Sequence, residues 1–451
     1  MKETKYKQTE VGMIPSDWEV AKLGNFVKKI DAGVSVNSDE SIYSDNYVLK
    51  TSAIHNGVIN YKEVKAVIKK DIHRLKCPLK EDCLIVSRMN TPDLVGECAY
   101  SEKDVDNIFL PDRLWLVPNE FKNKISFKLI NYVLNTPLMR NAIKGTATGT
   151  SNSMKNISKG KFLSIECAFP PTIEEQQRIA NALSDVDTLI ANLEKLIAKK
   201  KNSKQGAMQQ LLTGKKRLPG FGSDERQKEC HSERSAKREV EESSGYKMTE
   251  LGLIPIDWEV KPIKELGLFL GGGTPSTKNE SFWKGNIPWI SSADLNDDDI
   301  EHISMTRFIT QEAVNFSATQ ICPQGTILII ARVGVGKLAL SQQKVCTSQD
   351  FCNLIPSKEN DSKFLAYALL PVMKRMSNES QGTSIKGVAV DEIKKVQIIV
   401  PSSKDEQTAI ANVLSDMDAE IATLETKLAK YRTLKTGMMQ QLLTGKIRLI
   451  K

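Results

Sequence analysis

EEQQRIANALSDVD at residues 174–187 returns as DEQTAIANVLSDMD at residues 405–418, 231 residues further along the chain. A second pair of segments, TEVGMIPSDWEV at residues 9–20 and TELGLIPIDWEV at residues 249–260, is identical at 9 of 12 positions. A third, GAMQQLLTGKKRL from residue 206, returns as TGMMQQLLTGKIRL ending at residue 449. A repeat of such long period indicates two copies of one domain-plus-helix unit rather than a solenoid of many short repeats. We therefore expect pseudo-twofold symmetry within the chain.

The repeated block has the a/d spacing of a coiled coil in both copies. The first helix would be roughly 60 Å long from residue 174 to residue 212. One such stripe would suit a core-facing helix of a globular domain, but two stripes of equal length favour antiparallel pairing of the helices with each other. The predicted interface consists of Ile179, Leu183, Val186, Ile190, Leu193 and Ile197 in the first copy and Ile410, Leu414, Met417, Ile421, Leu424 and Leu428 in the second.

Both helices have predicted starts and stops. TIEE at residues 172–175 and SKDE at residues 403–406 are capping-box patterns, each placed just after proline. Gly214 and Gly445 follow the last apolar residues and suit the left-handed position beyond a helix C-terminus. The two helices are therefore expected to have the same length.

The composition is that of an ordinary globular protein, with 40% hydrophobic and 26% charged residues. A formal net charge of +8 permits an anionic partner without proving one, because basic surface must be clustered to bind nucleic acid. The eight cysteines contain no C-x-x-C pair and the four histidines lie far apart, so we expect no metal site. No signal peptide and no membrane-length apolar run is evident. We expect a cytoplasmic protein with unpaired, mostly buried cysteines.

The segments between the repeated blocks predict mixed α/β domains, with β-rich stretches at residues 46–54, 82–87, 326–332 and 396–400. Residues 222–245 have almost no apolar side chains and are interpreted as a flexible linker. The predicted fold is α+β, with two mixed α/β domains joined by two long antiparallel coiled-coil helices. The predicted parts are domain 1 at residues 1–170, helix 1 at 171–218, the charged linker at 219–248, domain 2 at 249–401 and helix 2 at 402–451.

Three segments resemble motifs of enzymes but lack residues that define those motifs. RVGVGK at residues 332–337 lacks the first glycine and the closing Ser or Thr of a Walker A loop. GGGTP at residues 271–275 lacks the dinucleotide-binding spacing. NTPD at residues 90–93 lacks the second proline and the aromatic residue of an amino-methyltransferase loop. We therefore predict no catalytic residue, no cofactor and no metal.

Loops rich in small polar and basic residues indicate a nucleic-acid partner, since such side chains hydrogen-bond base edges and phosphates. For any one of them an ordinary solvated loop is the alternative. The recurrence of Gly-Thr-Ser at residues 149–151 and 382–384 strengthens the group. The candidate DNA-binding residues are Arg88, Asn90, Thr150, Ser151, Asn152, Lys155, Ser291, Ser292, Arg332, Lys337, Thr383, Ser384 and Lys386.

In combination, these motifs resemble those of the specificity subunits of type I restriction–modification enzymes, over nearly the whole chain. The resemblance rests on I-P-x-x-W-E at residues 14–19 and 254–259, GGTPS at 272–276, IPWISSAD at 287–294 and the E-Q, I-A, L-S-D-x-D and QQLLTGK series of both helices. The first domain has DAGVS at residues 31–35 in place of GGTPS. Its target is therefore expected to differ from that of the second domain.

The resemblance implies a non-catalytic subunit with two target recognition domains, each reading one half of a bipartite, asymmetric site in double-stranded DNA. It implies that the helices set the spacer and dock modification subunits, two per chain, and that restriction subunits join through the assembled complex. No membrane partner is implied.

Two other readings compete with this one. A single-chain modification enzyme would need a cofactor-binding glycine loop and an amino-methyltransferase motif. A structural coiled-coil scaffold would bind protein through its globular ends. Salt-dependent DNA binding distinguishes the scaffold from a DNA-recognition subunit.

Overall fold

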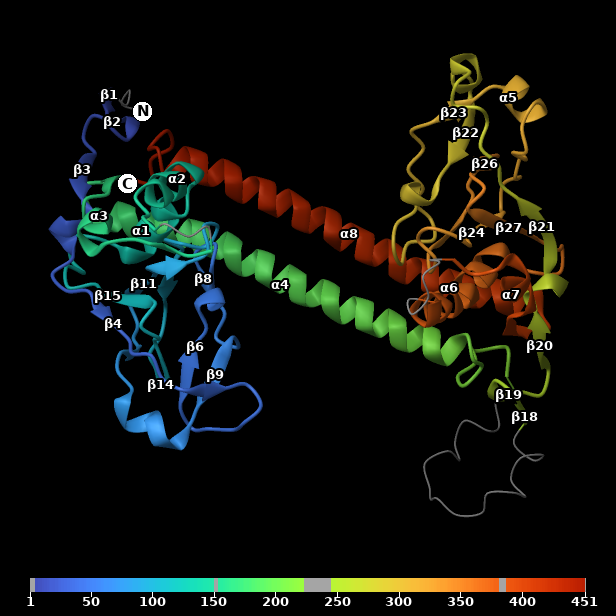
Figure 1. The fold of residues 1–451 in the computed structure, drawn as a ribbon, viewed down its shortest axis with the longest axis horizontal. Helices are drawn as coiled ribbons and strands as arrows, with labels where there is room; N and C mark the ends of the chain where they lie inside the picture. The colour runs from blue at the N-terminus through green and yellow to red at the C-terminus, as the bar shows by residue number, and fades with distance from the viewer. Residues whose placement is uncertain (1–4, 150–152, 223–244, 381–386, 451) are drawn as a thin grey trace. The chain divides into compact units, whose positions relative to one another are not determined.

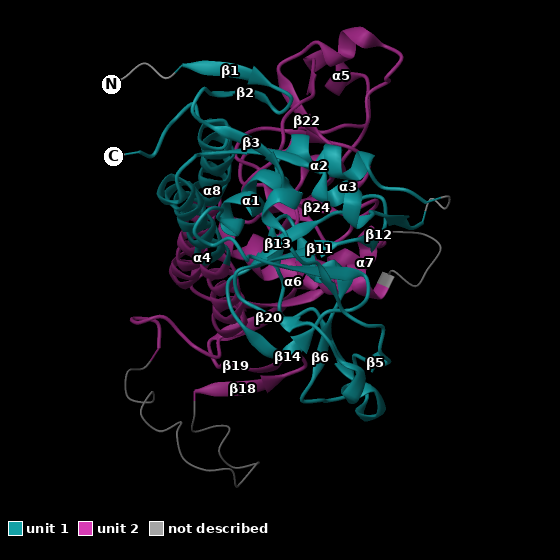
Figure 2. Cartoon of the chain, turned by 90° about the vertical axis from the view of Figure 1, so that its left-hand side faces the viewer, with its two compact units in different colours: residues 1–194, 426–451 teal, residues 195–425 magenta. Residues whose placement is uncertain are grey.

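The computed structural model describes residues 5–149, 153–222, 245–380 and 387–450. The chain divides into two compact units (Figure 2). Unit 1 consists of residues 1–194 and 426–451, and unit 2 of residues 195–425. This division cuts both long helices, α4 (Ile173–Leu211) and α8 (Lys404–Leu442). Each unit therefore contains one mixed domain, the first part of the helix that follows it and the last part of the other helix. The boundaries predicted from the sequence remain predictions.

The elements of the first domain are shown in Figure 1. Its helices and 3₁₀ turns are η1 (Leu23–Phe26), η2 (Thr51–Ala53), η3 (Lys69–Arg74), α1 (Phe127–Leu134), α2 (Pro137–Gly145) and α3 (Lys159–Leu163). Its strands are β1 (Tyr6–Thr9), β2 (Gly12–Pro15), β3 (Glu19–Lys22), β4 (Asp31–Ala32), β5 (Ser38–Asp39), β6 (Tyr47–Leu49), β7 (Ile54–His55), β8 (Val58–Ile59), β9 (Val64–Val67), β10 (Pro78–Leu79), β11 (Cys83–Ser87), β12 (Met89–Asn90), β13 (Cys98–Ser101), β14 (Val105–Phe109), β15 (Leu114–Pro118), β16 (Lys155–Asn156) and β17 (Glu166–Phe169).

The second domain repeats much of this order. Its helices and 3₁₀ turns are η5 (Ile263–Glu265), η6 (Glu280–Trp283), η7 (Ser292–Asp294), α5 (Gln311–Asn315), α6 (Ser362–Ser380) and α7 (Val390–Lys395). Its strands are β18 (Tyr246–Thr249), β19 (Gly252–Pro255), β20 (Trp258–Pro262), β21 (Gly267–Gly271), β22 (Ile287–Ile290), β23 (Phe308–Ile309), β24 (Ile327–Ile330), β25 (Leu338–Leu340), β26 (Cys346–Thr347), β27 (Phe351–Pro356) and β28 (Gln397–Pro401).

The central sheets of the two domains have the same topology. The order is β13-β11-β15-β4 in unit 1 and β21-β27-β24-β25, which is the same order read in reverse, in unit 2. A second sheet in each domain contains one parallel pair, β14 with β6 and β26 with β22. The short pairs β3–β17 and β20–β28 join the start of each domain to its end. The predicted α+β class with an internal repeat is confirmed.

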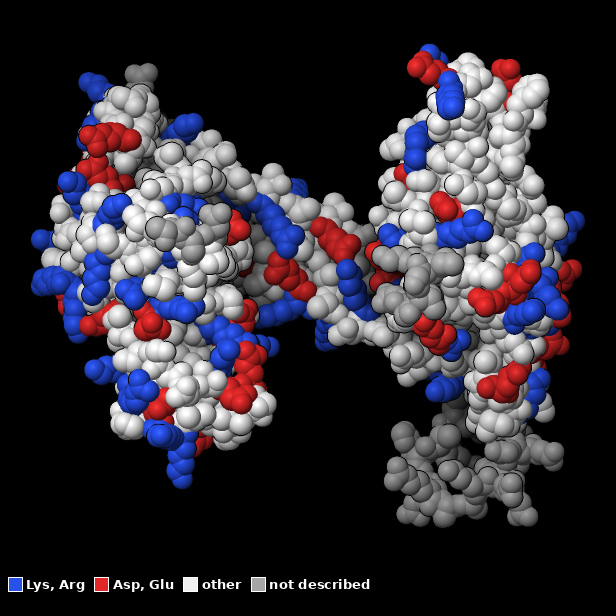
Figure 3. Space-filling view, in the orientation of Figure 1, with Lys and Arg blue, Asp and Glu red and all other residues white. Residues whose placement is uncertain are grey.

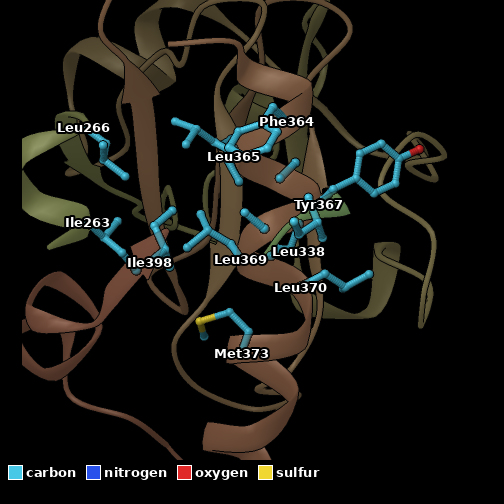
Figure 4. Packing of buried hydrophobic residues seen from close by; sticks show 14 of the residues in the cluster. Ile263, Leu266, Leu338, Phe364, Leu365, Tyr367, Leu369, Leu370, Met373 and Ile398 are labelled. Atoms are coloured by element: carbon cyan, nitrogen blue, oxygen red, sulfur yellow. The ribbon is translucent and has the colours of Figure 1, made fainter. Parts of the chain in front are cut away.

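Buried apolar strands and one amphipathic helix build each core. All five residues of β11 and all four of β24 are buried, as expected for strands covered on both faces. In unit 2, Phe364, Leu365 and Leu369 of α6 belong to one buried cluster with Ile263 and Ile398 (Figure 4). In unit 1 the equivalent cluster forms around α1 and includes the end of α8. The long helices are thus part of the domain cores at their ends.

The predicted capping boxes form only by half. The hydroxyls of Thr172 and Ser403 accept the backbone N–H groups of Glu175 and Glu406 at 3.4 and 3.5 Å. The two glutamate carboxylates, however, turn away from the helix starts and bind arginines. Tertiary contacts therefore override the local capping pattern at this position.

Each of these glutamates is almost fully buried, at 1% exposure of its side chain, and pairs with an arginine from beyond the end of the other helix. In unit 1, Arg448 contacts both carboxylate oxygens of Glu175 at 2.7 and 2.8 Å and both of Asp17 at 2.8 Å. In unit 2, Arg217 makes the same contacts to Glu406 and Asp257. We call each group an arginine clamp. Each clamp joins the start of one long helix to the end of the other and to the start of the domain.

The two C-terminal glycines have the predicted left-handed conformation, with φ of +69° at Gly214 and +68° at Gly445. A Cβ atom at Gly445 would lie 2.3 Å from Pro15, and one at Gly214 would lie 2.4 Å from Pro255. Glycine is therefore required here both for the backbone turn and for the close approach of the I-P-x-x-W segment.

None of the twelve predicted interface residues is exposed. Val186, Ile190, Met417 and Leu424 are half-buried and the other eight are buried. In unit 1, Lys435 of α8 pairs with Asp187 of α4 at 2.6 Å, and in unit 2, Lys204 of α4 pairs with Asp418 of α8 at 2.5 Å. These contacts show that α4 and α8 are antiparallel within each unit.

A tyrosine from each domain completes these ion pairs. The Tyr132 hydroxyl donates to Asp187 and the Tyr367 hydroxyl to Asp418, each at 2.7 Å. Burial, together with the neighbouring carboxylate, raises the pKa of both tyrosines, so both remain protonated donors. Each hydrogen bond fixes a domain helix, α1 or α6, to the long helix that follows its domain.

The described cysteines are unpaired, and all except the half-buried Cys77 are buried. Burial raises the pKa of Cys83 to about 11 and that of Cys98 to about 12, which keeps these thiols protonated and unreactive. Among the described residues, no cluster of His, Cys, Asp or Glu could hold a metal ion, and no helix is long and apolar enough to cross a membrane.

We expect Arg448→Met to destabilise unit 1 by about 3–5 kcal/mol, because the buried Glu175 carboxylate loses its partner. Lys446→Met removes the same charge from an exposed position and should leave stability within about 0.5 kcal/mol of wild type. Urea denaturation followed by fluorescence measures both variants. Equal stability of the two variants would contradict the proposed role of the clamp.

Candidate DNA interface

In unit 1 the chain leaves the buried strand β11 at Arg88. The Arg88 N–H donates to the Arg113 carbonyl at 3.0 Å, and the Arg88 carbonyl accepts the Ile157 N–H at 2.9 Å. The following strand β12 pairs with β16, which places Asn90 opposite Lys155. The polar loop that follows α2 therefore returns to the same edge as Arg88. The structure brings together three of the predicted DNA-binding residues, Arg88, Asn90 and Lys155.

Arg113 is a basic residue at this edge that the sequence analysis missed. It is exposed and directly precedes β15, which pairs with β11. Its signal in the sequence is weak, since it is one charged residue before a buried strand. Only the register Ser87↔Leu114 shows that this strand start lies beside Arg88.

The two predicted residues nearest the strand end differ in how far their side chains are engaged. Arg88 is half-buried, and its Nε donates to the Asp112 carbonyl at 2.9 Å. Asn90 is 8% exposed, donates to the Ser87 hydroxyl at 3.1 Å and accepts the Thr91 N–H at 2.9 Å. Both ends of its amide therefore have internal partners, which argues against the prediction that Asn90 reads a base.

In unit 2 the strand β24 leads to Ala331 and Arg332. The Ala331 N–H donates to the Asp350 carbonyl and the Ala331 carbonyl accepts the Val388 N–H, each at 2.8 Å. Arg332 forms a β-bridge with Gly387 and is exposed. Gly387 and Val388, which come after α6 in the chain, thus lie at the end of β24, as Ile157, which comes after α2, lies at the end of β11.

The sequence predicts that Arg88 and Arg332 correspond, because each directly follows a β-rich stretch, at residues 84–87 and 328–331. These contacts correct that prediction. Arg88 and Arg332 follow equivalent strands, but the residue in the backbone position of Arg88 is Ala331. Arg332 is offset by one residue. Because successive side chains in an extended segment point to opposite faces, the two arginines present their guanidinium groups differently. This offset is consistent with the half-buried state of Arg88 and the exposure of Arg332.

The chain beyond Arg332 is an exposed loop with unusual backbone. Val333, Gly334 and Gly336 have φ of +43°, +102° and +106°, and Val333 is 65% exposed. A β-branched residue in the left-handed region is a local outlier, and such strain is often found at binding sites. Lys337 closes this loop, but its ammonium donates to the Leu295 carbonyl and lies 3.7 Å from Asp297. This pairing opposes the predicted DNA contact of Lys337.

Ser291 and Ser292 follow β22. The Ser291 N–H and hydroxyl both bond to Asp294, at 2.7 and 2.9 Å, and Arg307 binds the Ser291 hydroxyl at 2.6 Å. Ser291 therefore caps the short turn η7, and this role opposes its predicted DNA contact. Ser292 is half-buried and lies near Gly334 of the exposed loop. Six further predicted residues lie outside the part of the chain that the structure describes: Thr150, Ser151, Asn152, Thr383, Ser384 and Lys386.

Beside each of these edges, a glycine allows two backbone segments to approach closely. A Cβ atom at Gly33 would lie 1.7 Å from the Leu110 carbonyl oxygen, and one at Gly272 would lie 1.9 Å from that of Ser348. DAGVS and GGTPS, although different in sequence, therefore meet the same packing requirement. In Figure 3, Lys and Arg side chains are spread over the visible face of the first domain, among fewer acidic ones.

The model of the type I restriction modification DNA specificity domain matches residues 15–201 and 255–430, once for each repeat. These two ranges cover most of the chain. The chain belongs to this family. A member of the family is a specificity subunit, which recognises DNA and is not the catalytic subunit.

Relatives from several organisms agree with this assignment. The MjaVIII specificity subunit of Methanocaldococcus jannaschii is 26% identical over 99% of this chain and 97% of its own length. The MjaIX specificity subunit of the same organism is 39% identical over 38% of this chain and 40% of its own length. The HindI specificity subunit of Haemophilus influenzae is 21% identical over 96% of this chain and 100% of its own length.

Two solved structures share the fold. The S subunit of a type I restriction–modification system from M. genitalium superimposes with a TM-score of 0.57 at 16% identity, covering 97% of this chain and 98% of that one. A chain from a study of complex assembly and conformational transition in a type I system gives 0.51, also at 16% identity, over 96% and 99%. At this identity the likeness concerns the fold alone.

We expect Asn90→Ala to destabilise this specificity subunit by about 1–3 kcal/mol, because Ser87 and Thr91 lose hydrogen-bond partners near the core. Chemical denaturation measures the loss. Lys155→Ala, opposite Asn90 in the same strand pair, should leave stability nearly unchanged. An Asn90→Ala protein of wild-type stability with a relaxed DNA target would show instead that Asn90 reads a base.

Proposed function

We propose that each unit reads one half of a bipartite, asymmetric site in double-stranded DNA through the edge at the end of its central strand. In unit 1 this edge contains Arg88, Arg113 and Lys155, and in unit 2 it contains Arg332. The observation that carries the proposal is that, in both units, residues that come after a domain helix lie at the same end of the same central strand. Basic groups at such an edge position the subunit on phosphates and bases.

We propose that the repeated helices set the distance between the two half-sites and dock modification subunits, two per chain. Restriction subunits would join through the assembled complex, in the cytoplasm. The internal repeat supports two equivalent docking positions, because similar surfaces in both copies can bind two copies of one partner.

Binding to DNA in the presence of modification subunits tests the proposal. Affinity for a specific duplex should fall steeply as salt rises, because Lys and Arg release counterions from phosphates. The chain alone should neither methylate nor cleave DNA. Affinity that does not change with salt would favour a protein-binding scaffold instead.

We predict that Arg332→Ala weakens specific binding by about 1–3 kcal/mol and changes only the half-site read by unit 2. Methylome mapping of a strain that carries the variant reveals which half-site relaxes. Lys264→Ala, an exposed charge change in the same unit, is the matched control. Unchanged affinity and an unchanged methylome for Arg332→Ala would place the interface elsewhere.

We also predict that one heptad added after Ile197 and one after Leu428 widens the gap between the half-sites by up to about three base pairs. Seven residues lengthen a helix by about 10 Å, and a base pair rises about 3.4 Å. Both half-sites should persist, although added pairs also rotate the groove and weaken binding. Altered half-sites with an unchanged gap would show that the helices do not set the spacing.

A further inference from the structure

The apolar seam of α4 continues past Ile197 into two lysines. The spacing of four and three residues reaches Lys200 and then Lys204. The equivalent positions of α8, 231 residues later, are Tyr431 and Lys435. The two helices therefore agree at one of these seam positions and differ at the other.

Most ion pairs between the helices are the same in the two units. Lys204–Asp418 corresponds to Lys435–Asp187 by the shift of 231 residues. Lys201–Glu425 corresponds in the same way to Arg432–Glu194. If α4 paired antiparallel with an α4 helix of a second copy, Asp187 would face Lys204 and Glu194 would face Lys201. These pairs therefore allow each helix to bind its own kind equally well.

One ion pair between the described parts of the helices has no counterpart under this shift. In unit 2, Lys200 of α4 contacts Glu420 of α8 at 2.6 Å, with side-chain exposures of 35% and 48%. The equivalent positions in unit 1 are Tyr431 and Leu189, which are both half-buried. Within the protein, charge therefore faces opposite charge at one place, and two apolar side chains occupy the equivalent places at the other.

Pairing of identical helices would mismatch both places. In an α4–α4 pair, Lys200 would face Leu189 of the second copy, and this would happen twice because the arrangement is symmetric. In an α8–α8 pair, Tyr431 would twice face Glu420. Each mismatch removes an ion pair and desolvates a charge against an apolar side chain.

We propose that the Lys200–Glu420 pair, with Leu189 and Tyr431, selects α8 as the partner of α4 and disfavours pairing with a second copy of the same helix. The face of α4 that contains Lys200 and Leu189 therefore fits α8 of the same chain better than α4 of a second copy. This selection keeps two different domains in one subunit. If each domain reads one half-site, as proposed above, the selection also keeps the DNA target asymmetric. The selection itself requires no DNA.

The test starts from the full chain with a protease site placed within residues 223–244. After cleavage, the purified protein consists of an α4 fragment and an α8 fragment. Isotope-labelled and unlabelled samples are mixed in just enough urea for the labels to exchange completely, and the urea is then removed. Native mass spectrometry counts the α4–α4, α4–α8 and α8–α8 pairs. Random pairing gives α4–α4, α4–α8 and α8–α8 pairs in a ratio of about 1:2:1. We expect the ratio of α4–α8 to α4–α4 pairs to be at least three times its random value.

Leu189→Glu should raise the α4–α4 share about fivefold, because the new carboxylate would face Lys200 of the partner helix twice in that pair. Asn192→Glu adds the same charge at an exposed position of the same helix and should change nothing. Lys200→Glu should lower the mixed share, and adding Glu420→Lys should restore it, which separates loss of selection from loss of folding. Random pairing of the wild-type fragments, equal effects of the two glutamate variants, or no rescue in the double variant would overturn the proposal.

Discussion

One buried glutamate in each unit constrains how the two long helices are arranged within that unit. Glu175 and Glu406 are each shielded from water at the start of a long helix, where an unpaired carboxylate would cost several kcal/mol. The compensating arginine comes from beyond the end of the other helix. Within each unit, this requirement permits only an antiparallel arrangement in which one helix begins beside the other helix's end.

The repeated motifs consist of residues that this arrangement needs. Beside Glu175, Gln176 is fully buried and donates to the Pro170 carbonyl, while its own carbonyl accepts the Ser126 N–H. Ile179 and Leu183 fill the seam, and Asp187 joins a lysine to a tyrosine. Identity between the two copies therefore marks the framework, whereas the segments between them are free to differ.

The candidate interface could be predicted only in part. Arg88, Asn90 and Lys155, which the sequence marked as candidates in two separate polar loops, lie at one edge of the structure. The sequence did not reveal that the side chains of Asn90 and Ser291 form hydrogen bonds within the protein, nor that Arg113 lies beside Arg88. It also paired Arg88 with Arg332, whereas the strand register aligns Arg88 with Ala331. Short strands with weak patterns leave the register undetermined until their partners are known.

The sequence by itself determined the internal repeat, the two long helices, their seam and the glycines at their ends, because helical periodicity and left-handed turns are local properties of the chain. Tertiary structure alone decided where the capping glutamates turn, since a carboxylate that can reach a half-buried arginine gains more than one that caps its own helix. It also decided which basic side chains reach the surface together. Those side chains lie in or directly beside strands far apart in the sequence, and only the hydrogen-bonded pairing of these strands brings them together.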